Sequence, residues 1–224
     1  MASSTSAAAA LIDEVRSELA PIDGKLASHP FVSALAAGEV PTASLERFAG
    51  EQHWIISSDR RSFAYLTARY ADSAAGELFL GLTQGEGTAL GHLGSFARWL
   101  GLDPGRLSEY EPTPGAHAYT AYVSWLALNG SATDVAVAFL ANLAVWGANC
   151  GRAAAALRSE YGAGATAVAF FEFFATPAPG FEERALAVIE AGLRAGVSPA
   201  RPRTAARLLQ AYELMFWDTM MAAT

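Results

Sequence analysis

The segment from Phe48 to Phe63 carries polar and aromatic side chains at a spacing that suits a binding pocket. On a helix of 3.6 residues per turn, one broad face would hold Phe48, Gln52, Ile55, Ile56, Asp59 and Phe63. Buried Gln52 and Asp59 need hydrogen-bond partners, because an unpaired buried polar group costs about 1–3 kcal/mol. A ligand in a pocket would provide them. The alternative is that Gln52 bonds a backbone group and Asp59 pairs with an arginine such as Arg60.

Glu213 lies near the end of the chain, between Tyr212 and the pair Phe216 and Trp217. Aromatic neighbours that exclude water raise the pKa of a carboxyl group, which suits a general acid or base. The alternative is a solvated glutamate on the outer face of a helix. Cys150 has no base close to it in the sequence, so we interpret it as a small core residue and not as a reactive thiolate.

The histidines do not form a metal-binding pattern. The chain has four, and none stands in a Glu-x-x-His or His-x-x-His spacing of the kind that helical metal sites use. Glu86 and His92 share one predicted helix, but their separation of six residues puts them on different faces. The first predicted helix holds no histidine that could bind heme. We therefore predict no metal and no cofactor.

The composition favours one globular domain over residues 1–224, with residues 1–6 as a loose tail. Its net charge is −7 and its fifteen basic residues are dispersed, which argues against direct binding of nucleic acid. A single cysteine excludes a disulfide within the chain and a thiolate zinc cluster. The N-terminus lacks the features of a signal peptide, and no apolar run reaches membrane-spanning length. We therefore predict a soluble, cytoplasmic protein.

Apolar residues recur at helical spacing along nearly the whole chain, and alternating strand patterns are scarce. Proline, glycine and asparagine mark the breaks between the helical segments. The predicted helices cover about residues 6–27, 31–37, 41–70, 73–100, 116–129, 132–160, 164–175, 179–195 and 200–222, with a loop over 103–115. This pattern predicts an all-α bundle of about eight helices.

Four motifs occur in an order that resembles the TenA/THI-4 family over about residues 10–222. They are the segments 29–32 (His-Pro-Phe-Val), 51–54 (Glu-Gln-His-Trp), 119–120 (Tyr-Thr) and 212–217 (Tyr-Glu-Leu-Met-Phe-Trp). The resemblance implies a heme-oxygenase-like all-α fold and assembly into a homodimer or homotetramer. The best-known members of the family are thiaminase II hydrolases of thiamine metabolism, and the family also carries the label of transcriptional activator.

The resemblance also assigns positions within the pocket. Gln52 stands where the family has an aspartate that binds the pyrimidine, and Ala144 stands at the nucleophilic cysteine. Tyr119 and Glu213 are retained, whereas Cys150 lies six residues after Ala144. Because an alanine cannot attack a ring carbon, the resemblance does not imply ordinary thiaminase II cysteine chemistry for this chain.

We therefore expect a small heteroaromatic ligand, for which a thiamin-related aminopyrimidine is one candidate, in a central pocket. Glu213 is the predicted catalytic residue, as proton donor or acceptor. The predicted ligand-binding residues are Gln52, Tyr119, Trp54, Trp146 and Phe170. The alternatives are a binding protein without turnover, an indirect regulator that acts through a protein partner, and a different metal-free reaction in the same cavity. No membrane partner is expected.

Overall fold

The computed structural model describes residues 6–222, and these form ten α-helices and no strand. The helices are α1 (Ala7–Ala27), α2 (Pro30–Ala36), α3 (Thr42–Arg69), α4 (Ala74–Trp99), α5 (Pro104–Ser108), α6 (Pro114–Asn129), α7 (Ala132–Tyr161), α8 (Ala165–Ala175), α9 (Phe181–Arg194) and α10 (Ala200–Ala222). The predicted all-α class is confirmed. Of the predicted tail, residues 1–5 lie outside the described residues, and Ser6 caps α1 by accepting a hydrogen bond from the Ala9 amide.

The predicted loop over residues 103–115 is only partly a loop. It contains the short helix α5, and α6 already begins at Pro114. Both helices have proline at the first position, where the backbone nitrogen needs no hydrogen for the helix. Asp103 completes the start of α5, because its Oδ1 accepts a 2.7 Å bond from the Gly105 amide. Prolines that suggest a loop in the sequence are therefore helix starts in the structure.

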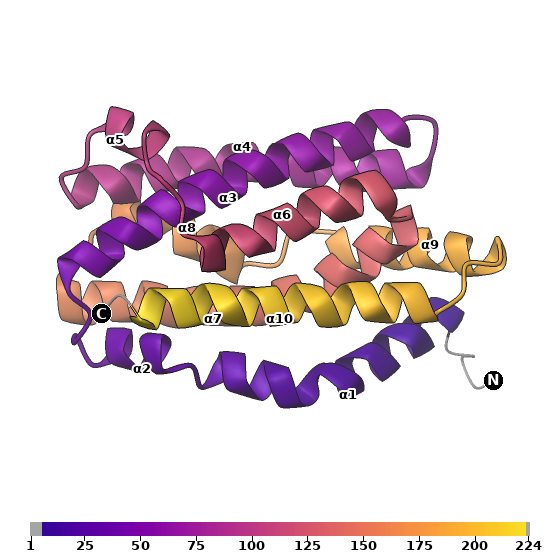
Figure 1. The fold of residues 1–224 in the computed structure, drawn as a ribbon, viewed down its shortest axis with the longest axis horizontal. Helices are drawn as coiled ribbons and strands as arrows, with labels where there is room; N and C mark the ends of the chain where they lie inside the picture. The colour runs from indigo at the N-terminus through magenta and orange to yellow at the C-terminus, as the bar shows by residue number, and fades with distance from the viewer. Residues whose placement is uncertain (1–5, 223–224) are drawn as a thin grey trace.

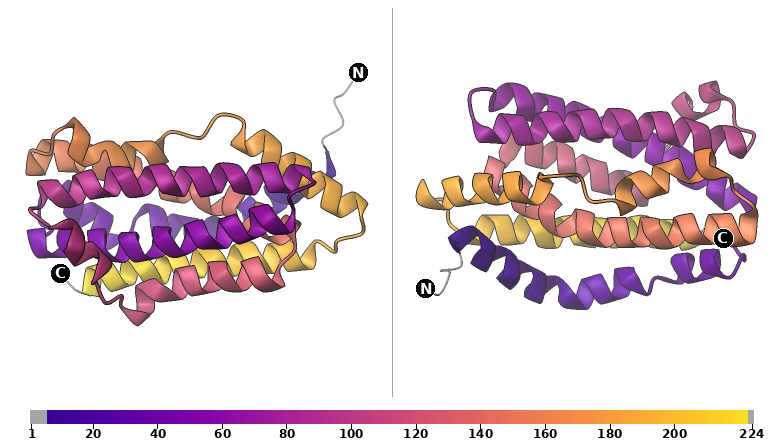
Figure 2. Two further views of the ribbon diagram at one scale, coloured as in Figure 1. Left: turned by 90° about the horizontal axis from the view of Figure 1, so that it is seen from above. Right: turned by 180° about the vertical axis from the view of Figure 1, so that it is seen from behind.

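The long helices run along one direction and form a layered bundle (Figure 1). The pair α3 and α4 packs together along one long edge, and α1 with α2 lies along the opposite edge. Between them lie α7 and α10, which pack against each other, and α6, which joins α10 to α3. Figure 2 shows α8 and α9 on the back of the bundle, where α8 packs against α4 and α7.

Two hydrophobic clusters fill the interior. The first is rich in aromatic rings and includes Phe48, Phe171 and Trp217. The second includes Phe63 and Phe139, whose rings lie 4.9 Å apart, centroid to centroid, in an edge-to-face arrangement. Side chains of α6 and α7 pack against both clusters, so the boundary between the clusters runs past these two helices.

Within residues 6–222, α7 alone is long and apolar enough to cross a membrane by length and composition. Most of its apolar stretch is buried inside the bundle. Packing against α1, α2, α8, α9 and α10 therefore accounts for its apolar character.

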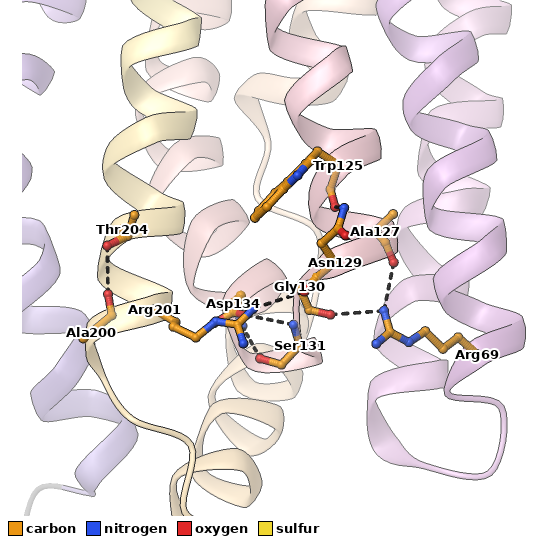
Figure 3. A network of polar contacts seen from close by, with 10 residues as sticks. All are labelled: Arg69, Trp125, Ala127, Asn129, Gly130, Ser131, Asp134, Ala200, Arg201 and Thr204. Atoms are coloured by element: carbon orange, nitrogen blue, oxygen red, sulfur yellow. Dashed lines mark hydrogen bonds and ion pairs between the residues drawn. The ribbon is translucent and has the colours of Figure 1, made fainter.

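The start of α7 is fixed by a polar network (Figure 3). The Ser131 Oγ accepts a bond from the Asp134 amide, and Asp134 Oδ2 accepts a 2.8 Å bond from the Ser131 amide, which forms a capping box. Arg201 of α10 lies 3.6 Å from the same Asp134 oxygen. Arg69 of α3 donates to the backbone oxygen of Gly130 at 3.1 Å. Three helices are thereby joined at this turn, which holds the rotation of α7 about its axis.

Candidate functional site

A pocket lies where the two hydrophobic clusters meet. It contains about 470 Å³ of space free of protein atoms, including the part open to solvent. This volume lies toward the small end of the range for small-molecule sites. The lining residues come from six helices and are Gln52, Ile55, Ile56, Asp59, Glu86, Tyr119, Phe139, Asn142, Leu143, Trp146, Phe174, Glu213 and Phe216.

The α3 side of the pocket follows the face that the sequence predicts. Gln52, Ile55 and Asp59 line the pocket at intervals of three and four residues, the spacing that keeps side chains on one face of a helix. Phe48 and Phe63 lie on the same face beyond the two ends of this stretch. They are buried, one in each hydrophobic cluster. The two clusters thus anchor both ends of the helical stretch that carries the polar side chains.

Glu213 lies at the centre of a buried hydrogen-bond network. Trp217 Nε1 donates to Glu213 Oε1 at 3.2 Å, and Asn142 Nδ2 donates to Glu213 Oε2. The same Asn142 nitrogen donates to Gln210 Oε1 at 2.7 Å, while Asn142 Oδ1 accepts a 2.9 Å bond from the Tyr119 hydroxyl. Both carboxylate oxygens of Glu213 are therefore held in place, and Tyr119 is tied to the same network.

Burial controls the protonation of Glu213. The side chain is only 2% exposed, and removal from water raises its pKa to about 8, against the lowering effect of the bonds from Trp217 and Asn142. The nearby charge of Asp23 raises the pKa further. Glu213 therefore keeps its proton over much of the neutral range and can donate it. The alternative of a solvated glutamate on the helix surface is wrong.

Two more carboxyl groups line the pocket from the α3 and α4 side. The Thr120 hydroxyl donates a 2.5 Å bond to Asp59 Oδ1, and burial raises the Asp59 pKa to about 7. Burial also raises the pKa of Glu86 well above its usual range, and the charge of Asp59 adds to this effect. Asp59 forms no ion pair with Arg60 or with any other basic residue of 6–222. The predicted alternative of an Asp59–arginine pair is therefore wrong.

The predicted ligand-binding residues divide into two groups. Gln52, Tyr119 and Trp146 line the pocket. Gln52 is 4% exposed and has no side-chain hydrogen-bond partner within residues 6–222, so the predicted alternative of a bond to a backbone group does not hold. Trp146 stacks parallel to Phe48 at 6.5 Å between ring centroids and forms an aromatic part of the wall.

Trp54 and Phe170 do not line the pocket. The Trp54 ring is 37% exposed, and its Nε1 donates a 2.8 Å bond to His117 Nδ1 on α6. Phe170 is fully buried and packs edge-to-face against Phe174 at 5.3 Å. Phe174, four residues further along α8, lines the pocket instead. One helical turn thus separates the predicted aromatic residue from the one that reaches the cavity.

The position that the family resemblance assigns to the nucleophile is occupied differently in space. Ala144 is exposed, and α7 presents Asn142 and Trp146 to the pocket. These two are four residues apart and therefore share a face, whereas Ala144 lies on another. Cys150 is buried in the aromatic cluster, outside the pocket lining, and burial raises its thiol pKa well above the usual range. The described lining contains no cysteine.

Sequence reasoning missed Asn142 and Glu86 as pocket residues. The available signal for Asn142 was a polar residue one turn before Trp146 on an otherwise apolar helix. Glu86 drew attention only in relation to His92, whose ring contacts Phe173 and not Glu86. Within residues 6–222 no group of three or more His, Cys, Asp or Glu side chains could hold a metal ion, and the absence of a cofactor stays a prediction.

Comparison with known proteins gives the fold family. A TenA homologue from P. horikoshii matches with 18% identity and a TM-score of 0.76, over 96% of this chain and 99% of that chain. A Sulfolobus solfataricus protein described as a TenA-like thiaminase has 14% identity and a TM-score of 0.63, over 95% and 96% of the two chains. Heme oxygenase-1 from Synechocystis, in complex with heme, has 14% identity and a TM-score of 0.66, over 95% of each chain. These likenesses establish a heme-oxygenase-like fold.

No curated protein matches the chain in sequence. The sequence model of the TENA/THI-4/PQQC family, however, matches residues 16–223, which is nearly the whole chain. This range includes all six helices that line the pocket. The chain therefore belongs to the TENA/THI-4/PQQC family.

Proposed function

We propose that this protein binds a small heteroaromatic compound in the central pocket, with an aminopyrimidine related to thiamin as the leading candidate. The observation that carries the proposal is the pocket itself, in which a buried protonated carboxyl group, Glu213, stands among aromatic rings and unpaired amide groups. Such a pocket matches a flat ring with nitrogen atoms around its edge, because the ring packs on the apolar wall and its nitrogens pair with polar groups.

Each polar group has a separate role in this proposal. Glu213 gives a proton to a ring nitrogen or a leaving group, or takes one back, because its pKa of about 8 lies close to neutral pH. Gln52 orients the ligand through its amide, which offers both a donor and an acceptor. Tyr119 keeps its hydroxyl directed at Asn142 and so supports the Glu213 geometry. Trp146 and Phe174 form the stacking surfaces.

Binding without turnover is the second candidate function. It is favoured by the absence of a cysteine from the described lining and by the burial of Cys150 in the core. In that case the protein would sense or carry the compound, and any effect on transcription would pass through a protein partner. The likeness to a protein described as a thiaminase keeps hydrolysis as the first candidate.

The test measures binding and turnover side by side. Calorimetry with the hydroxymethyl-aminopyrimidine fragment of thiamin reports binding, and chromatography of thiamin incubated with the protein reports hydrolysis. We expect Glu213→Gln to weaken binding or slow hydrolysis by about tenfold or more, the effect of losing one charged hydrogen bond. Met215→Ala, at a 43% exposed site on the same helix, is the matched control and should change neither. Binding without products would select the second candidate.

We further propose a cytoplasmic location and assembly into a homodimer or homotetramer, without direct contact to nucleic acid or membranes. The dispersed acidic charge of the chain supports the exclusion of nucleic acid. Light scattering coupled to gel filtration measures the oligomeric state, and a monomer at micromolar concentration would contradict the assembly proposal.

A further inference from the structure

Glu86 has no partner inside the protein. Its carboxylate makes no hydrogen bond and no ion pair within residues 6–222, and its Oε2 is enclosed and inaccessible to water. Burial of an unpaired carboxylate is costly, so such a group stays protonated or binds a donor from outside. Glu86 also lines the pocket, where a ligand can reach it. An unpaired side chain at this position indicates a contact that a ligand completes.

Asp59 stands beside Glu86 and increases the local excess of negative charge. It accepts one hydrogen bond, from Thr120, and its Oδ2 has no partner within residues 6–222. The proximity of Asp59 raises the pKa of Glu86, which places the two carboxyl groups within electrostatic reach of each other. No Lys, Arg or His side chain of 6–222 forms an ion pair with either. The pair thus lacks a cation that the protein itself could supply.

The remaining lining narrows the kind of cation. Asp59 and Glu86 have no third carboxylate, imidazole or thiolate close enough to complete a metal site. The pocket walls are aromatic and aliphatic, with Phe139, Phe174 and Ile56 among them. An organic cation suits these surroundings, since its carbon skeleton packs on the walls. A primary ammonium group carries three hydrogens that can pair with the free carboxylate oxygens.

We propose that Asp59 and Glu86 form a subsite for a protonated aliphatic amine on the ligand, distinct from the Gln52–Glu213 region that holds its ring. The two carboxyl groups project from α3 and α4, whereas Glu213 and Asn142 project from α10 and α7 on the other side of the same pocket. The ligand is accordingly an aminoalkyl-substituted aromatic compound. This subsite deepens the proposed function and rests on it only for the identity of the ring.

Ammonium binding should release a proton from the protein. Burial raises the pKa of both Asp59 and Glu86, and a bound cation lowers it again by favouring the ionised carboxylate. Calorimetry in two buffers with different heats of ionisation measures this proton release directly. A neutral ligand of the same shape should release none from this pair.

The decisive experiment compares matched probes that differ only in the amine. The first pair is the aminomethyl and hydroxymethyl forms of the thiamin aminopyrimidine, and the second is benzylamine and benzyl alcohol. The wild-type protein should prefer each amine by about ten- to hundredfold, as expected for one charge-assisted hydrogen-bond site. Glu86→Gln and Asp59→Asn should abolish most of this preference while the alcohols bind as before. Glu77→Gln, on an exposed part of α4, is the control that should retain it.

The outcomes separate this inference from the proposed function. Pyrimidine binding without a preference for the amine, or with a preference that survives Glu86→Gln, overturns the subsite and leaves the proposed function standing. A Glu86-dependent preference for benzylamine without any pyrimidine binding supports the subsite and contradicts the proposed ring. Failure of all four probes to bind overturns both. Because Glu86 has no partner to lose, Glu86→Gln should fold normally, and circular dichroism checks this.

Discussion

Asn142 on α7 donates its side-chain amide to two residues of α10 that are one helical turn apart, Gln210 at 2.7 Å and Glu213. Gln210 in turn donates to Asp23 on α1 at 2.5 Å. A single asparagine therefore links the pocket carboxyl group to the outer edge of the bundle. Because the network is buried, loss of any member leaves its neighbours unpaired. This relationship makes Asn142 a positioning residue for Glu213.

Replacing Asn142 with leucine should raise the pKa of Glu213 above its present value of about 8, because the Asn142 bond favours the ionised form. The variant should also lose about 1–3 kcal/mol of stability through unpaired polar groups. Carboxyl NMR titration of the protein labelled at glutamate measures the pKa, with Glu213→Gln to assign the signal. Asn129→Leu, at the exposed end of α6, is the control that should leave the titration unchanged. A lowered pKa would contradict the assigned direction of the bond.

Stability should fall as pH rises through the neutral range. The pKa of Glu213 rises from about 4.5 in the unfolded chain to about 8 in the folded protein. Between these values the folded state holds a proton that the unfolded state has lost, so unfolding becomes more favourable with pH by up to about 1.4 kcal/mol per unit. Asp59 acts in the same direction up to about pH 7. Below pH 4.5 and above pH 8 the Glu213 contribution is constant.

Urea unfolding of the wild type and Glu213→Gln across this range tests the prediction. Glutamine cannot ionise, so the variant should show a shallower decline between about pH 4.5 and 8. Groups that face Glu213, namely Tyr119, Asp23 and Cys150, are present in both proteins and largely cancel in the comparison. Identical slopes in the two proteins would show that Glu213 ionises normally in the folded state.

The helices were predictable because their breaks carry clear local signals. Gly162, for example, ends α7 in the left-handed conformation with a φ of 67°, which glycine adopts without strain. The short helix α5 was not predictable in the same way, since its prolines and glycine also favour a loop. In that segment tertiary contacts decide: the Tyr110 hydroxyl donates to buried Glu51 Oε1 at 2.9 Å and ties the chain to α3.

The site was predictable only where periodicity or family resemblance fixed a helix face. The Gln52–Asp59 face follows from periodicity within one helix, and Glu213 follows from its aromatic neighbours. Asn142, however, depends on how α7 is rotated against α10, and this rotation is set by long-range bonds such as that of Arg201. Local sequence does not encode that rotation, which explains why Ala144 was assigned a position that Asn142 occupies.

Cys150→Ala should leave ligand binding and any hydrolysis unchanged. The thiol is 1% exposed, lies outside the pocket lining and keeps its proton because burial raises its pKa. The variant should lose only about 1 kcal/mol of stability, a common effect of a small core substitution. Intact mass spectrometry after incubation with thiamin provides the sharpest check. A pyrimidine adduct on Cys150 would restore cysteine chemistry to this chain.

Gly147 on α7 should be intolerant of a side chain. A Cβ there would lie 2.7 Å from the backbone oxygen of Phe174, closer than such atoms approach in proteins. The backbone of α8 would have to move, so Gly147→Ala should cost about 1–3 kcal/mol despite the higher helix propensity of alanine. Because Phe174 lines the pocket, the same substitution should also weaken ligand binding.

Gly151, one turn further along α7, provides the matched control. A Cβ at that position would meet the Ala175 Cβ at 3.6 Å, an ordinary contact. Gly151→Ala should therefore be neutral or should stabilise the protein by up to about 1 kcal/mol, the helix-propensity gain of alanine over glycine. Thermal unfolding of both variants measures the difference. Equal stability of the two would show that α8 is free to shift and that the close approach at Gly147 does not hold Phe174 against the pocket.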